Sequence, residues 1–209
     1  MTGCLLLQLY AALQLYAALL LMLPLGRRRR KAWFHRALHL LCRLFLATIF
    51  TTRTRRINPR GERFERPAVV VANHQSFVDI LLLLSLSPRL VMVTNHWVWR
   101  SPFFGRIVRF AGFHSTESGY ERLAEELRRE VDDGYSVVVF PEGTRSADLE
   151  VHRFHRGAFQ LAERLGLDTV PVAIYGSGLI CSKRQPFYIK RGDLSCLVME
   201  RVAPAEGGP

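Results

Sequence analysis

The chain has 209 residues, of which 49% are hydrophobic and 22% are charged, and its formal net charge is +11 at pH 7. This composition excludes a disordered chain, and the length is enough for one domain with a substantial core plus an appendage. Residues 1–60 hold eleven of the 29 Lys and Arg residues and none of the 18 acids, so the basic excess lies in the N-terminal part. Such an excess indicates an anionic partner, either a membrane surface or a nucleic acid.

The first predicted element is an apolar helix, because only Gln8 and Gln14 interrupt the apolar stretch from Cys4 to Leu25. About 20 helical residues are enough to cross a bilayer core of ~30 Å. A basic run at 27–31 follows at once, which predicts that the bulk of the chain faces the cytoplasm, at the cell inner membrane or another cytoplasm-facing membrane. A cleaved signal peptide is the alternative, but it requires basic residues before the apolar run. We expect an uncleaved anchor that spans the bilayer or lies partly within it.

A second helix is predicted from Ala32 to Phe50. Its apolar positions include Trp33, Phe34 and Leu44, and Arg36 lies among its polar positions. A basic helix with aromatic residues is typical of the membrane interface, and a helix packed on the globular domain is the alternative. We therefore divide the chain into an anchor and interfacial helix (1–50), a polar linker (51–67) and a globular domain (68–209).

The globular domain alternates short apolar strands with helices of about ten residues. This alternation predicts an α/β fold with a mixed sheet covered by helices. The expected strands are 68–72, 90–94, 136–140, 169–175 and 194–198, and the expected helices are 77–86, 103–110, 121–131 and 158–165.

A segment rich in polar residues, Asn73–Asp79, directly follows the first of these strands. A hydroxyl group becomes a good nucleophile when a histidine takes its proton and a carboxylate fixes the histidine tautomer. His74 and Asp79 form such a pair only if the chain turns from loop to helix between them, since five helical residues would set them about 140° apart. Asp79 is also placed to cap the helix with Ser76, and the two roles are compatible.

A second polar segment, Phe140–Ser146, follows the Val-rich strand. Gly143 allows backbone N–H groups to approach a ligand, and Arg145 offers a guanidinium fork suited to phosphate or carboxylate. The carboxyl ends of strands in open α/β sheets are where ligands bind.

The two segments together resemble the lysophosphatidic acid acyltransferase family (1-acylglycerol-3-phosphate O-acyltransferases). The hallmark His-x-x-x-x-Asp box is intact as His74 to Asp79, and the Phe-Pro-Glu-Gly-Thr-Arg box is intact as Phe140–Arg145. Ser101–Gly105 resembles the intermediate motif of the family, and Val170–Ala173 resembles its later apolar motif. The resemblance covers roughly residues 65–180.

The resemblance implies a mechanism and a set of site residues. His74, oriented by Asp79, deprotonates the acceptor hydroxyl, which attacks the thioester carbonyl of an acyl carrier protein or coenzyme A. The acceptor head group would be held by Glu142, Gly143, Thr144 and Arg145, and the acyl chain would lie against Pro102, Phe103, Gly105, Val170 and Pro171. The resemblance implies no metal and no other cofactor. The expected product is phosphatidic acid, made from 1-acyl-sn-glycerol-3-phosphate.

Two positions depart from the family pattern. Members that act on lysophosphatidic acid often carry a Lys where this chain has Asn95, and an Asp-Arg pair near the position of His114. Because charge-assisted bonds hold a phosphate, these changes leave a lyso-aminolipid or a glycolipid as an alternative acceptor, with Arg100, Arg106 or His114 as possible helpers of Arg145.

Two other classes remain as alternatives. The same pair of residues would serve an acyl hydrolase if water replaced the lipid hydroxyl. A non-catalytic membrane or nucleic-acid binder would need only the basic arm, but the chain carries no nucleic-acid motif, and we expect lipids rather than nucleic acid as the partner.

Overall fold

The structure is a computed structural model that describes residues 2–48, 53–102, 104–185 and 190–204. Its centre is a sheet of seven strands in the order β1-β7-β6-β2-β5-β3-β4. All neighbouring strands pair in parallel except β6 and β7, so the sheet is mixed, and the predicted α/β class is confirmed. The strands are β1 (Thr54–Ile57), β2 (Val69–Ala72), β3 (Leu90–Thr94), β4 (His114–Ser115), β5 (Ser136–Val139), β6 (Thr169–Tyr175) and β7 (Leu194–Val198).

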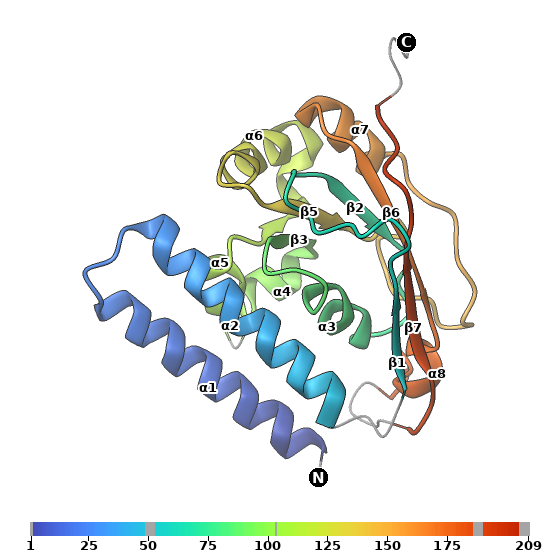
Figure 1. Cartoon of the computed structure of the whole chain (residues 1–209), viewed down its shortest axis with the longest axis horizontal. Coiled ribbons are helices and arrows are strands. Elements are labelled where there is room, and N and C mark those ends of the chain that lie inside the picture. The colour runs from blue at the N-terminus through green and yellow to red at the C-terminus, as the bar shows by residue number, and fades with distance from the viewer. Residues whose placement is uncertain (1, 49–52, 103, 186–189, 205–209) are drawn as a thin grey trace.

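The central strands are buried on both faces, as their uninterrupted apolar runs require. All four residues of β2 and all four of β5 are buried. Helices α6 and α7 cover one face of the sheet, and α2 and α3 lie on the other (Figure 1). The helices are α1 (Thr2–Met22), α2 (Arg27–Thr48), α3 (Val78–Leu84), α4 (His96–Arg100), α5 (Gly105–Phe110), the 3₁₀ turn η1 (Thr116–Ser118), α6 (Gly119–Asp132), α7 (Gly157–Leu165) and α8 (Ser177–Ile180).

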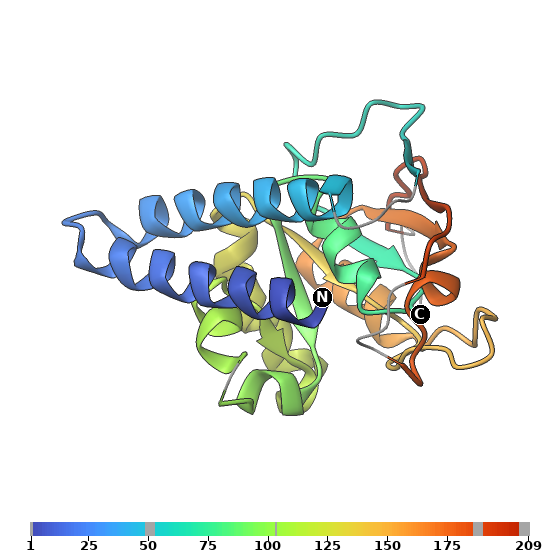
Figure 2. The same ribbon diagram turned by 90° about the horizontal axis from the view of Figure 1, so that it is seen from below.

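The first two helices form an antiparallel hairpin, in which α2 lies between α1 and the sheet domain (Figures 1 and 2). One face of α1 is buried through Leu13, Ala17 and Leu20, which join the same apolar core as the sheet. In the part of the chain that the structure describes, no helix is long and apolar enough to cross a membrane, so the predicted transmembrane helix is not supported.

Helix α2 is partly a core helix and partly an exposed one. Phe34 and Phe45 are buried against the domain, whereas Trp33 is 50% exposed and Leu40 is 64% exposed. The alternative of a helix packed on the globular domain is therefore correct for one face of α2. The other face keeps the aromatic and basic pattern on which the interfacial prediction rested.

The polar stretch at 51–67 contains a strand that the sequence did not predict. Strand β1 pairs in parallel with β7, with Thr54 opposite Leu194 and Ile57 opposite Leu197. Its sequence, Thr-Arg-Arg-Ile, has little apolar character, and all its residues are exposed or half-buried. Only the pairing with a strand 140 positions later makes it part of the sheet. Residues Thr54–Ile57 of the predicted linker are thus a strand of the sheet.

Candidate active site

The two polar segments lie side by side because their strands are neighbours. Strands β2 and β5 pair in parallel, with Val71 opposite Val139, so the loops that follow them leave the sheet at the same edge. A backbone hydrogen bond from Ser146 N to His74 O, 2.8 Å long, joins these loops directly. The His74 and Arg145 segments therefore meet at the carboxyl ends of these two strands.

His74 and Asp79 form the expected contact. His74 lies in the loop before α3, and its Nδ1 is 2.9 Å from Asp79 Oδ2. The Asp79 side chain is fully buried, and 13% of the His74 side chain is exposed. The imidazole ring stacks on the ring of Phe140, with 3.9 Å between centroids and 14° between planes. With Nδ1 directed at the carboxylate, the second ring nitrogen is left for a substrate.

The loop-to-helix turn that allows this contact is held by Asp79 itself. Asp79 Oδ2 also accepts hydrogen bonds from the backbone N–H groups of Gln75 and Ser76, at 2.7 and 2.8 Å. The carboxylate therefore caps the start of α3 and orients His74 with the same oxygen atom. Within the described residues, its other oxygen, Oδ1, is buried and has no hydrogen-bond partner. A buried oxygen without a hydrogen-bond partner is unusual in a folded protein.

Glu142 ties the two loops together. Its carboxylate accepts a hydrogen bond from His74 N (2.7 Å) on one oxygen and from His152 N (3.1 Å) on the other. The residue is 6% exposed. Both oxygens are thus occupied by backbone N–H groups, and this geometry indicates that Glu142 positions the His74 loop. The substrate-binding role implied by the resemblance remains a prediction.

The next three residues of the motif form an open turn. Gly143 adopts a φ of +70°, a left-handed conformation that favours glycine, and Gly143 N donates to Phe140 O at 3.1 Å. Gly143 and Thr144 are exposed, and Arg145 is half-buried. Among the described residues, no carboxylate lies within ion-pair distance of the Arg145 guanidinium, so this cation is open to an anionic ligand.

The residues predicted to contact an acyl chain differ in their burial and lie on different elements. Val170 is fully buried in β6 opposite Val70, and Pro171 is half-buried beside it. Pro102 is exposed, and Phe103 lies outside the described residues. Gly105 is buried where α4 meets α5. A side chain does not fit there, because a Cβ atom would lie 2.6 Å from Trp99 O. For Val170 and Gly105 the structure shows packing, and their predicted contact with an acyl chain remains untested.

His114 belongs to a different part of the molecule. Strand β4 is the edge strand, separated from β2 by β5 and β3. His114 lies 3.4 Å from both Glu126 and Glu130 of α6, and burial lowers its pKa. Lys31 of α2 pairs with the same Glu130 and lies over the ring of Tyr135. We call Lys31, Glu130, His114 and Tyr135 the α2–α6 junction; it gives His114 a structural setting away from the catalytic loops.

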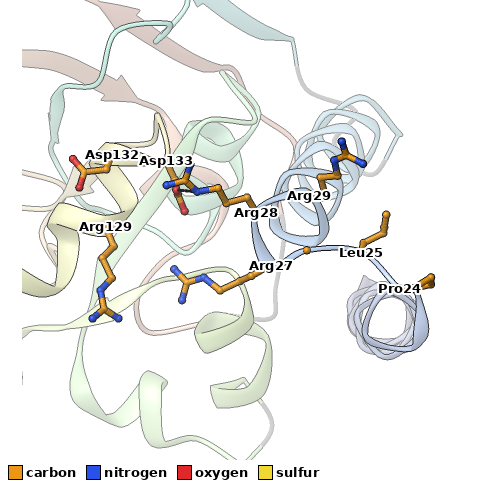
Figure 3. Close-up of a pocket in the computed structure, with 9 residues that line it drawn as sticks. Pro24, Leu25, Arg27, Arg28, Arg29, Arg129, Asp132 and Asp133 are labelled. Carbon is orange, nitrogen blue, oxygen red and sulfur yellow. Dashed lines mark ion pairs between the residues drawn. The ribbon is translucent and has the colours of Figure 1, made fainter.

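A cavity of about 720 Å³ lies beside this junction, at the turn between α1 and α2 (Figure 3). Arg28 forms an ion pair with Asp133 across it, at 2.5 Å. No residue of the His74 or Arg145 loops lines the cavity. Its lining comprises Pro24, Leu25, Gly26, Arg27, Arg28, Arg29, Arg129, Asp132 and Asp133.

Two contributors to the catalytic edge were missed by the sequence reading. Asn73 bridges β2 to β6, since its amide donates to Ile174 O at 2.9 Å and accepts from Ile174 N at 2.7 Å. Lys183, after α8, donates from Nζ to Arg145 O at 2.7 Å and to Thr144 Oγ1 at 3.2 Å. Asn73 is the first residue of the polar segment Asn73–Asp79 and was available as a signal, whereas the sequence around Lys183 offers none.

The arrangement is that of an α/β protein with an imidazole–carboxylate pair beside the loop that carries Arg145. A solved structure with this fold is 1-acyl-sn-glycerophosphate (LPA) acyltransferase, PlsC, from Thermotoga maritima. The two superpose with a TM-score of 0.71 at 21% identity, over 93% of this chain and 86% of the other, a likeness of fold. Residues 49–175 match the model of the Acyltransferase family, and the chain belongs to that family.

Sequence relatives carry two kinds of name. The chloroplastic 1-acyl-sn-glycerol-3-phosphate acyltransferase LPAT1 of Arabidopsis thaliana is 32% identical over 142 residues, or 64% of this chain and 39% of the relative. The lyso-ornithine lipid O-acyltransferase of Pseudomonas aeruginosa is 34% identical over 158 residues, or 72% of this chain and 55% of the relative. The chain spans less than half the length of the plant and algal relatives.

Proposed function

We propose that the protein transfers a fatty acyl group from a thioester to the free hydroxyl of 1-acyl-sn-glycerol-3-phosphate and so makes phosphatidic acid. The single observation that carries this proposal is the His74–Asp79 contact at the carboxyl edge of the sheet, beside the open Arg145 guanidinium. Family membership and the names of the relatives support the same chemistry.

The proposed mechanism uses His74 as a general base. A proton on Nδ1 is held by Asp79, so Nε2 is free to take the proton of the acceptor hydroxyl. The hydroxyl oxygen then bonds to the thioester carbonyl carbon. The tetrahedral intermediate collapses with cleavage of the carbon–sulfur bond, and the thiolate takes the proton back from the imidazolium. No acyl-enzyme is formed, and Asp79 acts by positioning and stabilising the imidazolium.

The acyl donor is proposed to be acyl carrier protein or coenzyme A in thioester form. The chemistry then needs no metal or redox cofactor, because the thiolate is already a good leaving group and the imidazole supplies the base.

A second acceptor class has its own support. The Pseudomonas relative is named for a lyso-ornithine lipid, and Asn95 is an exposed, uncharged residue at the start of α4. A lyso-aminolipid with a carboxylate would still suit the Arg145 guanidinium, since carboxylate and phosphate are both held by its fork.

The test is acyl transfer by purified protein in detergent, with lysophosphatidic acid, monoacylglycerol and a lyso-ornithine lipid as acceptors. We expect transfer to lysophosphatidic acid and much less to monoacylglycerol. Transfer to the lyso-ornithine lipid alone would reassign the acceptor. Release of free fatty acid without acceptor, and no transfer to any lipid, would make the protein a hydrolase and contradict the proposal.

We also propose that the α1–α2 hairpin rests on an anionic, cytoplasm-facing membrane. The outer face of α2 exposes Trp33, Leu40 and Leu44 together with Arg36 and Arg43, which is the pattern of an interfacial helix. Replacing Trp33, Leu40 and Leu44 by Ser should reduce co-sedimentation with vesicles of phosphatidylcholine and phosphatidylglycerol. Unchanged sedimentation would place membrane contact elsewhere.

A further inference from the structure

Lys183 lies in a segment that hydrogen bonds attach to both catalytic loops. Ser76 Oγ, in the His74 loop, donates to Cys181 O at 2.6 Å, two residues before Lys183. Lys183 itself donates to Arg145 O and Thr144 Oγ1, in the other loop. The charges of both Arg145 and Asp79 act on the pKa of the Cys181 thiol, which burial raises above its usual value. The Lys183 ammonium therefore belongs to the same edge of the sheet as the proposed catalytic pair.

This placement gathers two positive charges without a negative one. Among the described residues, neither Lys183 nor Arg145 has a carboxylate within ion-pair distance. The nearby acids are already used: Glu142 accepts two backbone N–H groups, and Asp148 accepts from Ser146 Oγ at 2.7 Å and contacts His152. Lys183 and Arg145 come from two different segments of the catalytic edge, and an anion bound by both would reduce the repulsion between two unpaired cations.

The geometry of the ammonium group leaves room for a ligand. A lysine ammonium has three N–H donors, and two of those of Lys183 are directed at the Arg145 loop. Because Lys183 is half-buried rather than exposed, its position is constrained by these contacts. The third donor is left for a ligand at the loop that carries Arg145, whose guanidinium offers its own fork of donors.

We propose that Lys183 is a second cation of the acceptor site, and that it holds the phosphate monoester of the acceptor together with Arg145. This inference rests on the proposed function and adds a residue to it. The same chemistry would suit a phosphate of the acyl donor, and the proposal commits to the acceptor. Lys183 would then help to determine specificity for a phosphorylated acceptor.

The experiment compares Lys183→Gln, Lys183→Arg and wild type, with Arg184→Gln as the matched control. Glutamine removes the charge and keeps an N–H donor for the loop, and Arg184 is an exposed basic neighbour. We expect Lys183→Gln to raise the KM for lysophosphatidic acid about 10- to 100-fold, as loss of a charge-assisted phosphate contact implies. The kcat and the KM for the acyl donor should stay near wild type, and Lys183→Arg should recover most of the loss.

Each contrary result has a definite meaning. An unchanged KM for lysophosphatidic acid in Lys183→Gln would overturn the inference, and so would an increase confined to the acyl donor or a fall in kcat alone. An equal loss in Arg184→Gln would show that general positive charge, rather than the Lys183 position, is responsible.

A binding measurement separates this inference from the proposed function. The Kd for lysophosphatidic acid is measured without acyl donor, so that no turnover is needed. Wild-type protein that binds the lipid but transfers nothing would contradict the proposed function while the Lys183 comparison still stands. A Kd that is the same in wild type and Lys183→Gln would overturn the inference even if transfer occurs.

Discussion

The catalytic edge and the α2–α6 junction both bury charged side chains, but they neutralise them in different ways. At the catalytic edge, the carboxylates of Asp79 and Glu142 accept backbone N–H groups, and within the described residues no lysine or arginine pairs with them. At the junction, Lys31 and Glu130 pair directly with each other, and both side chains are 6% exposed. Where the backbone neutralises the acids, nearby cations stay available for an anionic ligand. Where a cation is already paired with a carboxylate, it is not available to bind a ligand.

The largest expected effect concerns Asp79, the carboxylate that both caps α3 and orients His74. In Asp79→Asn, the amide oxygen still accepts from the backbone N–H groups of Gln75 and Ser76 and from His74 Nδ1, but the negative charge that stabilises the imidazolium is lost. We expect kcat to fall about 10²- to 10⁴-fold with the fold retained. Steady-state kinetics and far-UV circular dichroism test this. Near-normal kcat would show that the catalytic edge does not depend on this carboxylate.

At the junction, the expected effect is on stability and not on catalysis. Lys31→Met leaves the buried Glu130 with only its longer contact to His114, which should cost about 3–5 kcal/mol in the free energy of unfolding. Urea denaturation measures this free energy, and the double variant Lys31→Met with Glu130→Leu should regain much of the lost stability. Arg28→Met is the matched control, because Arg28 of α2 pairs with Asp133, the residue after α6. The Arg28 side chain is 77% exposed, so its removal should cost about 0–1 kcal/mol. Equal losses in the two single variants would contradict the contrast.

Glu142 provides an intermediate case. In Glu142→Gln, the amide –NH₂ faces a backbone N–H group of His74 or His152, so one buried donor loses its acceptor, at a cost of about 1–3 kcal/mol. The midpoint temperature of thermal unfolding and kcat should both fall, because the His74 loop is displaced. The exposed Glu150 in the same loop is the control, and Glu150→Gln should change neither. A rise in the KM for acceptor without loss of stability would instead favour direct substrate binding by Glu142.

A smaller, pH-dependent effect is expected where Glu62 pairs with Arg201, at 2.6 Å. The hydrogen bonds from Arg201 lower the pKa of Glu62 below 4.5 in the folded protein. The pair therefore contributes fully to the free energy of unfolding at pH values above the pKa of Glu62 in the unfolded chain. This contribution is lost as the pH falls through the lower pKa of Glu62 in the folded protein. Urea unfolding should separate wild type from Glu62→Gln by about 1 kcal/mol at pH 7 and by less at pH 3. A gap that widens in acid would contradict this linkage.

Most of the sheet and the catalytic pair were predictable from local sequence, and the remainder depended on distant contacts. Strands β3, β6 and β7 coincide with the predicted ranges, since each is a run of apolar or β-branched residues. Strand β1 was not predictable, because it is defined by pairing with β7. Likewise, the geometry of Glu142 and the position of Lys183 are set by contacts to residues 68 and 38 positions away. For α2 the sequence left both an interfacial helix and a helix packed on the domain open, because amphipathicity alone does not say what covers an apolar side.

The central claim is that the imidazole of His74 is the base for acyl transfer. The most direct measurement is the rate of transfer from an acyl thioester to lysophosphatidic acid by wild type and His74→Ala, both at saturating substrates, with thermal unfolding as the check on folding. The account predicts a loss of about 10²- to 10⁴-fold in kcat, with a single cooperative unfolding transition in both proteins. Transfer by a folded His74→Ala at a rate near that of wild type would contradict it.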